Sequence, residues 1–294
     1  MSAQVPSSRA RQSPGRFQLQ AERLGPLPLV NHFITRLGLE PLLERHLPTT
    51  DKRTGLSSAK ALGVLVRSII VEREPIYRQQ ETVRGFAPGM YGLNAEQMER
   101  LNDDQIGRAL DRLFDADRAA LLTEAVLAAA RAFDLSLKEL HNDSTTVRLS
   151  GRYAAARGRR LRGKRAPWIT YGHSKDHRPD LKQLLFILTT TADGAIPVQF
   201  RCGDGNTNDA TTHVDTWQSL RSIAGRADFL YVADSKLCTH EAMSLIDGHG
   251  GRFVTVLPRS RLEDREFRHW IQEHQPAWDR AWDRPNPRRR RGPR

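Results

Sequence analysis

The chain has 294 residues, 38% of them hydrophobic, and a formal net charge of +12, so it has room for a substantial core and for two domains. It has no apolar run near the roughly 18 residues of a membrane-spanning helix, and its polar first 16 residues lack the apolar core of a secretory signal. A pI of about 10.3 favours a polyanionic partner, most simply nucleic acid, although ribosomal and membrane-surface proteins are similarly basic.

The first half of the chain has the apolar spacing of helices. Residues 1–22 are rich in Ser, Gln, Pro and Arg and are expected to be disordered. Helices are then predicted over residues 29–37, 39–43, 57–71, 102–114 and 115–130, with caps at Ser57, at Asn102 and at Asp115 or Asp117. Residues 23–135 are therefore predicted to form an all-α domain. A helix-turn-helix DNA reader is one interpretation of it, and a purely structural domain is the simpler one.

Beyond Leu135 the pattern becomes that of strands. Strands are predicted over residues 137–147, 183–191, 196–200, 228–233 and 252–257, and helices over 211–224 and 241–248. Asp193-Gly194 is typical of a two-residue hairpin turn. This order predicts a mixed α/β sheet with flanking helices over residues 136–258. Residues 259–294 form a charged, Arg-rich tail. Cys202 and Cys238 form no CxxC pattern, so reduced thiols are expected.

Two aspartates carry the strongest chemical signal. Asp143 and Asp234 are each predicted to close a strand, and the strand order allows those strands to be neighbours. Carboxylates at the ends of adjacent strands can hold divalent metal for phosphodiester chemistry. The alternative interpretation is that Asp143 caps a turn with Ser144 and that Asp234 caps a helix.

Basic residues gather in two predicted loops. The candidate DNA contacts are Arg157, Arg159, Arg160, Arg162, Lys164 and Arg165 in the first loop, Lys175, His177, Arg178 and Lys182 in the second, and Lys236 after Asp234. A disordered insertion is the alternative for the first loop, and a solvated charged loop for the second. His173 and His177 are four residues apart but lie in a loop without a third ligand, which argues against zinc.

Four blocks of sequence resemble one family. They are Leu101-Asn102-Asp103-Asp104 with Arg108-Ala109-Leu110-Asp111-Arg112-Leu113, His141-Asn142-Asp143-Ser144-Thr145, the stretch from Gly172 to Gln183, and Ala233-Asp234-Ser235-Lys236. Together they resemble insertion-sequence DDE transposases of the IS-four-like group. The resemblance implies a ribonuclease H-like catalytic domain in which Asp143 is the first catalytic acid and Asp234 the second, and an N-terminal domain that binds element ends.

The resemblance also implies a third acid, which the sequence does not supply. In the family a glutamate follows a β-rich insertion, and the chain is expected to end before both, so that the ribonuclease H-like domain is incomplete. Glu263, Glu266 and Glu273 lie in a short charged segment, and none is assigned this role.

The expected function follows from the resemblance. The complete enzyme would use two Mg²⁺ or Mn²⁺ ions to cleave DNA at element ends and transfer the strand to target DNA, in the bacterial cytoplasm near the nucleoid. Further expected partners are a second copy of the chain or a full-length transposase subunit, and no membrane. With two acids, little or no cleavage is expected from this chain alone. The alternative is a non-catalytic DNA-binding remnant that regulates transposition.

Overall fold

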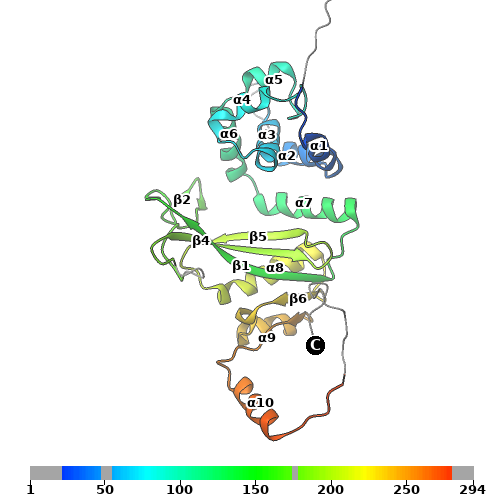
Figure 1. Cartoon of the computed structure of the whole chain (residues 1–294), viewed down its shortest axis with the longest axis vertical. Coiled ribbons are helices and arrows are strands. Elements are labelled where there is room, and N and C mark those ends of the chain that lie inside the picture. The colour runs from blue at the N-terminus through cyan, green and yellow to red at the C-terminus, as the bar shows by residue number, and fades with distance from the viewer. Residues whose placement is uncertain (1–21, 48–54, 174–177, 280–294) are drawn as a thin grey trace, which may run out of the picture. The chain divides into compact units, whose positions relative to one another are not determined.

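The computed structural model describes residues 22–47, 55–173 and 178–279. The chain divides into two compact units between Ala132 and Phe133, a helical unit followed by a sheet unit (Figure 1). The expected disorder of residues 1–22 lies almost wholly outside the described residues. None of the helices in the described ranges has the length and apolarity needed to cross a bilayer. The predicted fold class, an all-α region followed by a mixed α/β sheet with flanking helices, is confirmed.

Within the described ranges, the N-terminal unit has seven α-helices. They are α1 (Leu27–Arg36), α2 (Leu39–His46), α3 (Ser58–Val71), α4 (Gln79–Arg84), α5 (Ala95–Arg100), α6 (Asp103–Asp115) and α7 (Arg118–Phe133). The predicted caps are present: Ser57 accepts from the backbone of Lys60 at α3, and Asn102 accepts from Gln105 at α6. Asp117, rather than Asp115, caps α7. The short helices α4 and α5 were not predicted because each has fewer than two turns of apolar spacing.

A buried arginine ties the helical unit together. Arg67 on α3 is 4% exposed and donates to the side chain of Asn31 at 2.7 Å, to the Gly63 carbonyl at 3.0 Å and to Glu40 at 3.0 Å. Lys60 also donates to Glu40, at 2.8 Å. Burial by itself would raise the pKa of Glu40, but the hydrogen bonds from Lys60 and Arg67 hold that pKa below its ordinary value.

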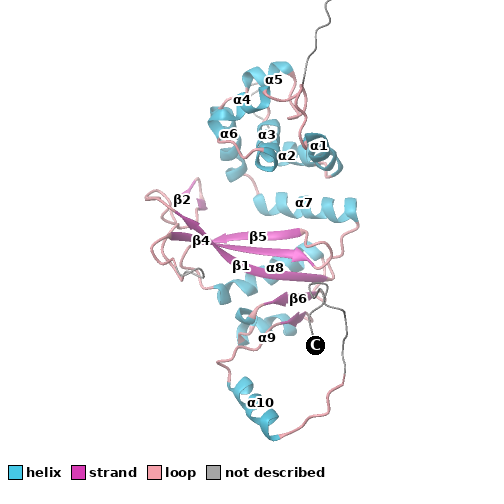
Figure 2. Cartoon of the chain, in the orientation of Figure 1, coloured by secondary structure: helices cyan, strands magenta, loops and turns pink. Residues whose placement is uncertain are grey.

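The second unit is built on a five-stranded mixed sheet (Figure 2). Its strands are β1 (Glu139–Leu149), β4 (Lys182–Thr191), β5 (Pro197–Gly203), β6 (Leu230–Ala233) and β7 (Arg252–Val254), in the spatial order β5-β4-β1-β6-β7. β1, β4 and β5 pair antiparallel, whereas β6 and β7 add in parallel beside β1. The helices of this unit are α8 (His213–Ala224), α9 (His240–Gly248) and α10 (Leu262–Glu273).

Helices α8 and α9 cover one face of the sheet. Trp217 of α8 is fully buried and stacks on Phe229, and His213 of α8 reaches Tyr231 on β6. The chain crosses from β5 to β6 through α8 and from β6 to β7 through α9, in the same direction across the sheet. Right-handed crossovers that advance in one direction place both helices on one face. Burial therefore alternates along β1: Leu140 and Asn142 face these helices and are buried, whereas Asp143 belongs to the opposite face and is exposed.

Further details of the sheet unit differ from the sequence prediction. The β4–β5 hairpin forms, but its loop spans residues 192–195, and positive φ values occur at Gly194 (71°) and Ala195 (52°) rather than at Asp193 and Gly194. The two-residue turn was wrong because the backbone of Thr191 pairs with Ile196, which leaves four residues between them. The helix α10 was not predicted.

Candidate active site and nucleic-acid interface

Asp143 lies in the interior of β1, not at its end as the sequence predicted. β1 continues for six residues beyond it because β4 pairs with β1 through Leu149. The Asp143 carboxylate accepts a hydrogen bond from its neighbour's amide, Ser144 N, at 2.7 Å. Because this contact lies within a strand, Asp143 does not cap a turn with Ser144, and that alternative is wrong.

Asp234 follows the last residue of β6, as predicted. It keeps an extended backbone (φ −69°, ψ −175°), and its side chain caps the short 3-10 turn η4 (Ser235–Leu237) by accepting from Lys236 N at 3.0 Å. Its carbonyl accepts from the Thr255 hydroxyl at 2.6 Å, which ties it to the chain after β7. The capping alternative for Asp234 is thus present, and it leaves the second carboxylate oxygen without a partner among the described residues.

The parallel register brings the two aspartates together. Asn142 of β1 stands opposite Ala233 of β6, so the next step along both chains sets Asp143 beside Asp234. Neighbouring strands are about 4.8 Å apart, and facing residues of a parallel pair project to the same side. The burial pattern agrees, since Asn142 and Ala233 are buried whereas both aspartates are exposed. The predicted adjacency of the two strands is confirmed.

The donor chemistry of this pair fits a hard divalent cation. Mg²⁺ in proteins is typically held by one or two carboxylates, completed by water and by phosphate oxygens of a substrate. Asp143 and Asp234 offer that set at an exposed position. Within the described ranges there is no group of three or more His, Cys, Asp or Glu side chains arranged to hold a metal. A cation here would therefore rely on these two carboxylates and on oxygens from outside the chain.

Behind Asp234 lies a buried imidazole. The ring of His213 approaches the Tyr231 hydroxyl with its Nδ1 at 3.0 Å. Burial lowers the pKa of His213, and the charges of Asp234 and Asp209 oppose that shift only in part. Burial likewise raises the pKa of Tyr231, and the charge of Asp234 adds to the rise. His213 and Tyr231 are therefore neutral near pH 7 and support the strand that ends at Asp234.

The first basic segment is an ordered β-hairpin. β2 (Arg160–Leu161) pairs with β3 (Lys164–Arg165), and the two turn residues Arg162 and Gly163 both have positive φ (48° and 78°), as a type I′ turn requires. Arg165 forms an ion pair with Asp204, which also accepts from Trp168 N at 2.9 Å and so anchors the hairpin to the loop after β5. The disordered-insertion alternative is therefore wrong.

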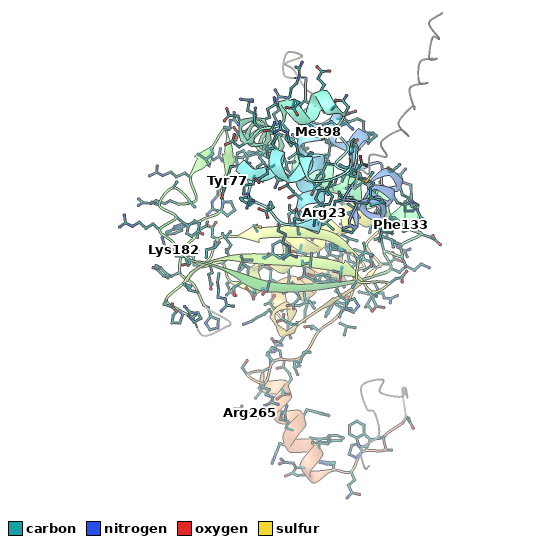
Figure 3. All side chains as sticks on the ribbon, turned by 45° about the horizontal axis from the view of Figure 1, so that its top comes forward. Arg23, Tyr77, Met98, Phe133, Lys182 and Arg265 are labelled. Atoms are coloured by element: carbon teal, nitrogen blue, oxygen red, sulfur yellow. The ribbon has the colours of Figure 1, made fainter. Side chains whose placement is uncertain are left out.

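The remaining predicted cations differ in how far they are already paired. Arg178 makes a two-pronged ion pair with Asp180, at 2.8 and 2.7 Å. Lys182, at the start of β4 and labelled in Figure 3, donates to the Arg152 carbonyl, and its ammonium lies 5.9 Å from the ring centre of Tyr171. Lys236 is exposed and carries no ion pair to a described residue. The predicted contacts Lys175 and His177 lie outside the described residues.

A cavity of about 580 Å³ opens beside this region, and sequence reasoning missed it. Its wall is set by Gln183, whose buried amide donates to the carbonyls of Gly205 at 2.8 Å and His173 at 3.2 Å. Gly172 and Gly205 cross so closely that a Cβ on Gly172 would lie 1.9 Å from the Gly205 oxygen. Gly172 and Gln183 bound one of the four quoted blocks, but no local pattern indicated that Gly205 would cross the chain there.

Comparison with known proteins adds the following. Residues 19–127 match a family described as a domain of unknown function (DUF4277). No curated protein shows significant sequence similarity to the chain. Similar solved structures include a piggyBac transposase synaptic complex with hairpin DNA, at 11% identity and a TM-score of 0.41, covering 86% of this chain and 53% of that one. They also include a Mos1 transposase paired-end complex with left transposon end, at 10% identity and a TM-score of 0.26, covering 76% and 72%. The chain thus spans about half the length of the piggyBac chain.

Proposed function

We propose that this protein is a DNA-processing protein of the DDE transposase type, which binds DNA through its basic surface and acts on phosphodiester bonds at Asp143 and Asp234. The observation that carries the proposal is the register of β1 and β6, because it supports a position for the exposed Asp143 next to Asp234, the residue after β6. The four sequence blocks that resemble insertion-sequence transposases support it, because the two aspartates lie in two of them.

The carboxylates are proposed to hold Mg²⁺ or Mn²⁺. When bound, such an ion supplies charge neutralisation for the phosphate and activation of an attacking oxygen. Asp143, which is held by the rigid centre of β1, is the fixed ligand. Asp234 is oriented by Lys236 N and by the bond from Thr255. With two ions, Asp143 and Asp234 would be the residues of this chain that hold them.

The basic hairpin is proposed to contact the DNA backbone. Arg157, Arg159 and Arg160 are exposed and form no ion pair with a described acid, so their charges remain available for phosphate. Arg165 has a different role, because its ion pair with Asp204 fixes the hairpin in place. Arg178 is a weaker contact than the sequence predicted, since Asp180 already satisfies its guanidinium.

The proposal is tested by a nicking assay. Purified full-length chain is incubated with a supercoiled plasmid that carries the DNA flanking its own gene, with Mg²⁺, with Mn²⁺ and with EDTA. Because the described residues supply no third acidic ligand, we expect at most slow nicking by this chain alone, and any conversion to the nicked circle should require the metal. Asp143→Asn and Asp234→Asn should lower it more than about 100-fold, because even outer-shell partners of a metal ligand are worth 10- to 100-fold. Asp247→Asn, a matched removal of an exposed carboxylate on α9, should leave it unchanged.

A separate measurement of DNA binding distinguishes the DNA-binding part of the proposal from its catalytic part. DNA affinity is measured by fluorescence anisotropy for the same variants. If the wild-type chain binds DNA but nicks none, the protein is a DNA-binding regulator and the catalytic assignment falls. If Asp143→Asn nicks as fast as the wild type, the cleavage belongs to another site or to a contaminant. If no DNA binding appears even at low salt, the proposal as a whole is wrong.

A further inference from the structure

The cavity beside Lys236 has the chemistry of a base-recognition pocket. At about 580 Å³ it lies within the 300 to 1,000 Å³ range usual for small-molecule sites. Its floor is Leu185, which is 2% exposed, and its rim carries the side chains of Thr146, Asn206 and Asn208. The lining also includes the charged groups of Asp209 and Lys236. An apolar floor with amides and hydroxyls around it suits the flat face and polar edges of a nucleobase.

One lining group has an unmet requirement. The Thr146 hydroxyl is shielded from water and has no hydrogen-bond partner among the described residues. A buried polar atom without a partner is destabilising, so native structures rarely keep one unless something else satisfies it. A ligand with a polar edge placed over Leu185 would satisfy this hydroxyl.

The other lining groups are partly fixed. The Asn208 side-chain oxygen accepts from Ala210 N at 3.1 Å, which leaves its amide N–H groups as donors toward the cavity. The Asp209 carboxylate accepts from the Ser144 hydroxyl at 2.9 Å. Asn206 is exposed, with no side-chain hydrogen bond to a described residue, so both halves of its amide are available.

The cation at the rim connects the cavity to the aspartate pair. Lys236 lines the cavity and follows Asp234 by two residues, and its backbone N–H donates to the Asp234 carboxylate. A phosphate held between Lys236 and the metal site would therefore leave its attached sugar and base next to the cavity mouth. A paired base is stacked and shielded within the duplex, so the fitting ligand is an unpaired nucleotide.

We propose that this cavity, lined by Thr146, Leu185, Asn206, Asn208 and Lys236, binds the base of one unpaired nucleotide of the DNA strand that is engaged at Asp143 and Asp234. The inference rests on the proposed function for the source of the nucleotide. It does not depend on cleavage, because the pocket residues are separate from the two aspartates.

The test compares a base with its absence. A duplex with a one-nucleotide overhang is labelled, and a second duplex carries an abasic residue in the overhang. Binding of the full-length chain is followed by anisotropy in EDTA. We expect about tenfold tighter binding of the overhang with a base, which is about 1.4 kcal/mol and matches the net contribution of one or two hydrogen bonds to the base edge. Thr146→Val and Asn206→Ala should abolish this ratio and leave the affinity for the abasic duplex unchanged.

The controls separate the pocket from the fold and from catalysis. Thr145→Val makes the same exchange one residue earlier on β1, where the side chain faces the opposite side of the sheet, and should retain the ratio. A wild-type chain that keeps the ratio but nicks no DNA would remove the catalytic proposal alone. A ratio near one in the wild type, or equal effects of Thr145→Val and Thr146→Val, would overturn the pocket assignment.

A second arm keeps the two proposals distinguishable if the duplexes bind poorly. Deoxyadenosine monophosphate alone is titrated into the chain, and the side-chain amide resonances of asparagine are followed by NMR. We expect concentration-dependent shifts of two amide groups, one of which is missing in Asn206→Ala. Absence of any shift at millimolar ligand refutes the pocket, whatever the nicking assay gives.

Discussion

Replacing Arg67 by Met should destabilise the helical unit and leave the stability of the sheet unit unchanged. The guanidinium is 4% exposed and makes three hydrogen bonds within 3.0 Å. Its removal leaves Asn31 and the Gly63 carbonyl without that donor, and it leaves Glu40 with Lys60 alone. Breaking a buried ion pair from one side costs about 3–5 kcal/mol. At a urea dependence near 1.5 kcal/mol/M, the unfolding midpoint should fall by roughly 2 M or more.

The distribution of tryptophan makes this prediction measurable in the full chain. All five tryptophans follow residue 133, so their fluorescence reports only on the sheet unit, whereas seven of the ten α-helices that dominate the far-UV signal lie in the helical unit. In Arg67→Met we expect an early loss of ellipticity at 222 nm with an unchanged fluorescence transition. Arg84→Met, which removes a half-exposed pair with Glu99, should change stability by at most about 1 kcal/mol.

Lowering the pH should weaken the same contacts of Glu40 with Arg67 and Lys60. The pKa of Glu40 is lowered in the folded chain, so the stability it contributes is present above its ordinary value of 4.5 and is lost as pH falls through the lowered value. The urea midpoint of the ellipticity transition should therefore fall as the pH drops below about 4.5, and it should fall less in Glu40→Gln. If Arg67→Met shifts fluorescence and ellipticity together, or shifts neither, the claim that this network holds only the helical unit is refuted.

Three further predictions concern the sheet unit. The pKa of buried His213 is lowered below its ordinary 6.5, so its contribution to stability is complete above that pH and declines as pH falls below it; the fluorescence transition of His213→Gln should depend less on pH between 7 and 5. Arg160→Gln should reduce the slope of log affinity for DNA against log salt by about one, whereas Arg178→Gln should change it less because Asp180 already pairs that charge. Gly205→Ala would place a Cβ 2.1 Å from the Gln183 carbonyl and should destabilise the unit by about 3 kcal/mol, whereas Gly248→Ala, with no atom within 4 Å, should be nearly neutral in urea unfolding.

The sequence predicted elements well where a local pattern was long enough. The strand from Lys182 to Thr191 and the capped helix α3 each have an apolar pattern that admits one interpretation. The position of Asp143 was misjudged because a local run of apolar residues cannot reveal which partner extends a strand. The pairing with β4 carries β1 onward through polar residues such as Thr145 and Arg148.

Sites made by distant segments were harder to predict. Asp143 and Asp234 were selected because each was predicted to close a strand, and the register supports their adjacency. Nothing local indicated that Gly205 would cross Gly172, or that Asp204 would neutralise Arg165 across 39 residues. Such contacts depend on loop paths that only the assembled sheet determines.

The unequal lengths of β1 and β6 explain why both proposed sites occur near the end of β6, on opposite faces of the sheet. β1 has 11 residues but β6 has only four, and their pairing ends at Asn142 and Ala233. From that point β1 has no parallel neighbour in the sheet. On one face the termination leaves Asp143 beside Asp234, and on the other it leaves room over Leu185 that the loop carrying Asn206 encloses. Lengthening β6 would pair the rest of β1 and close both sites, so the early end of this strand is the feature on which the proposed chemistry depends.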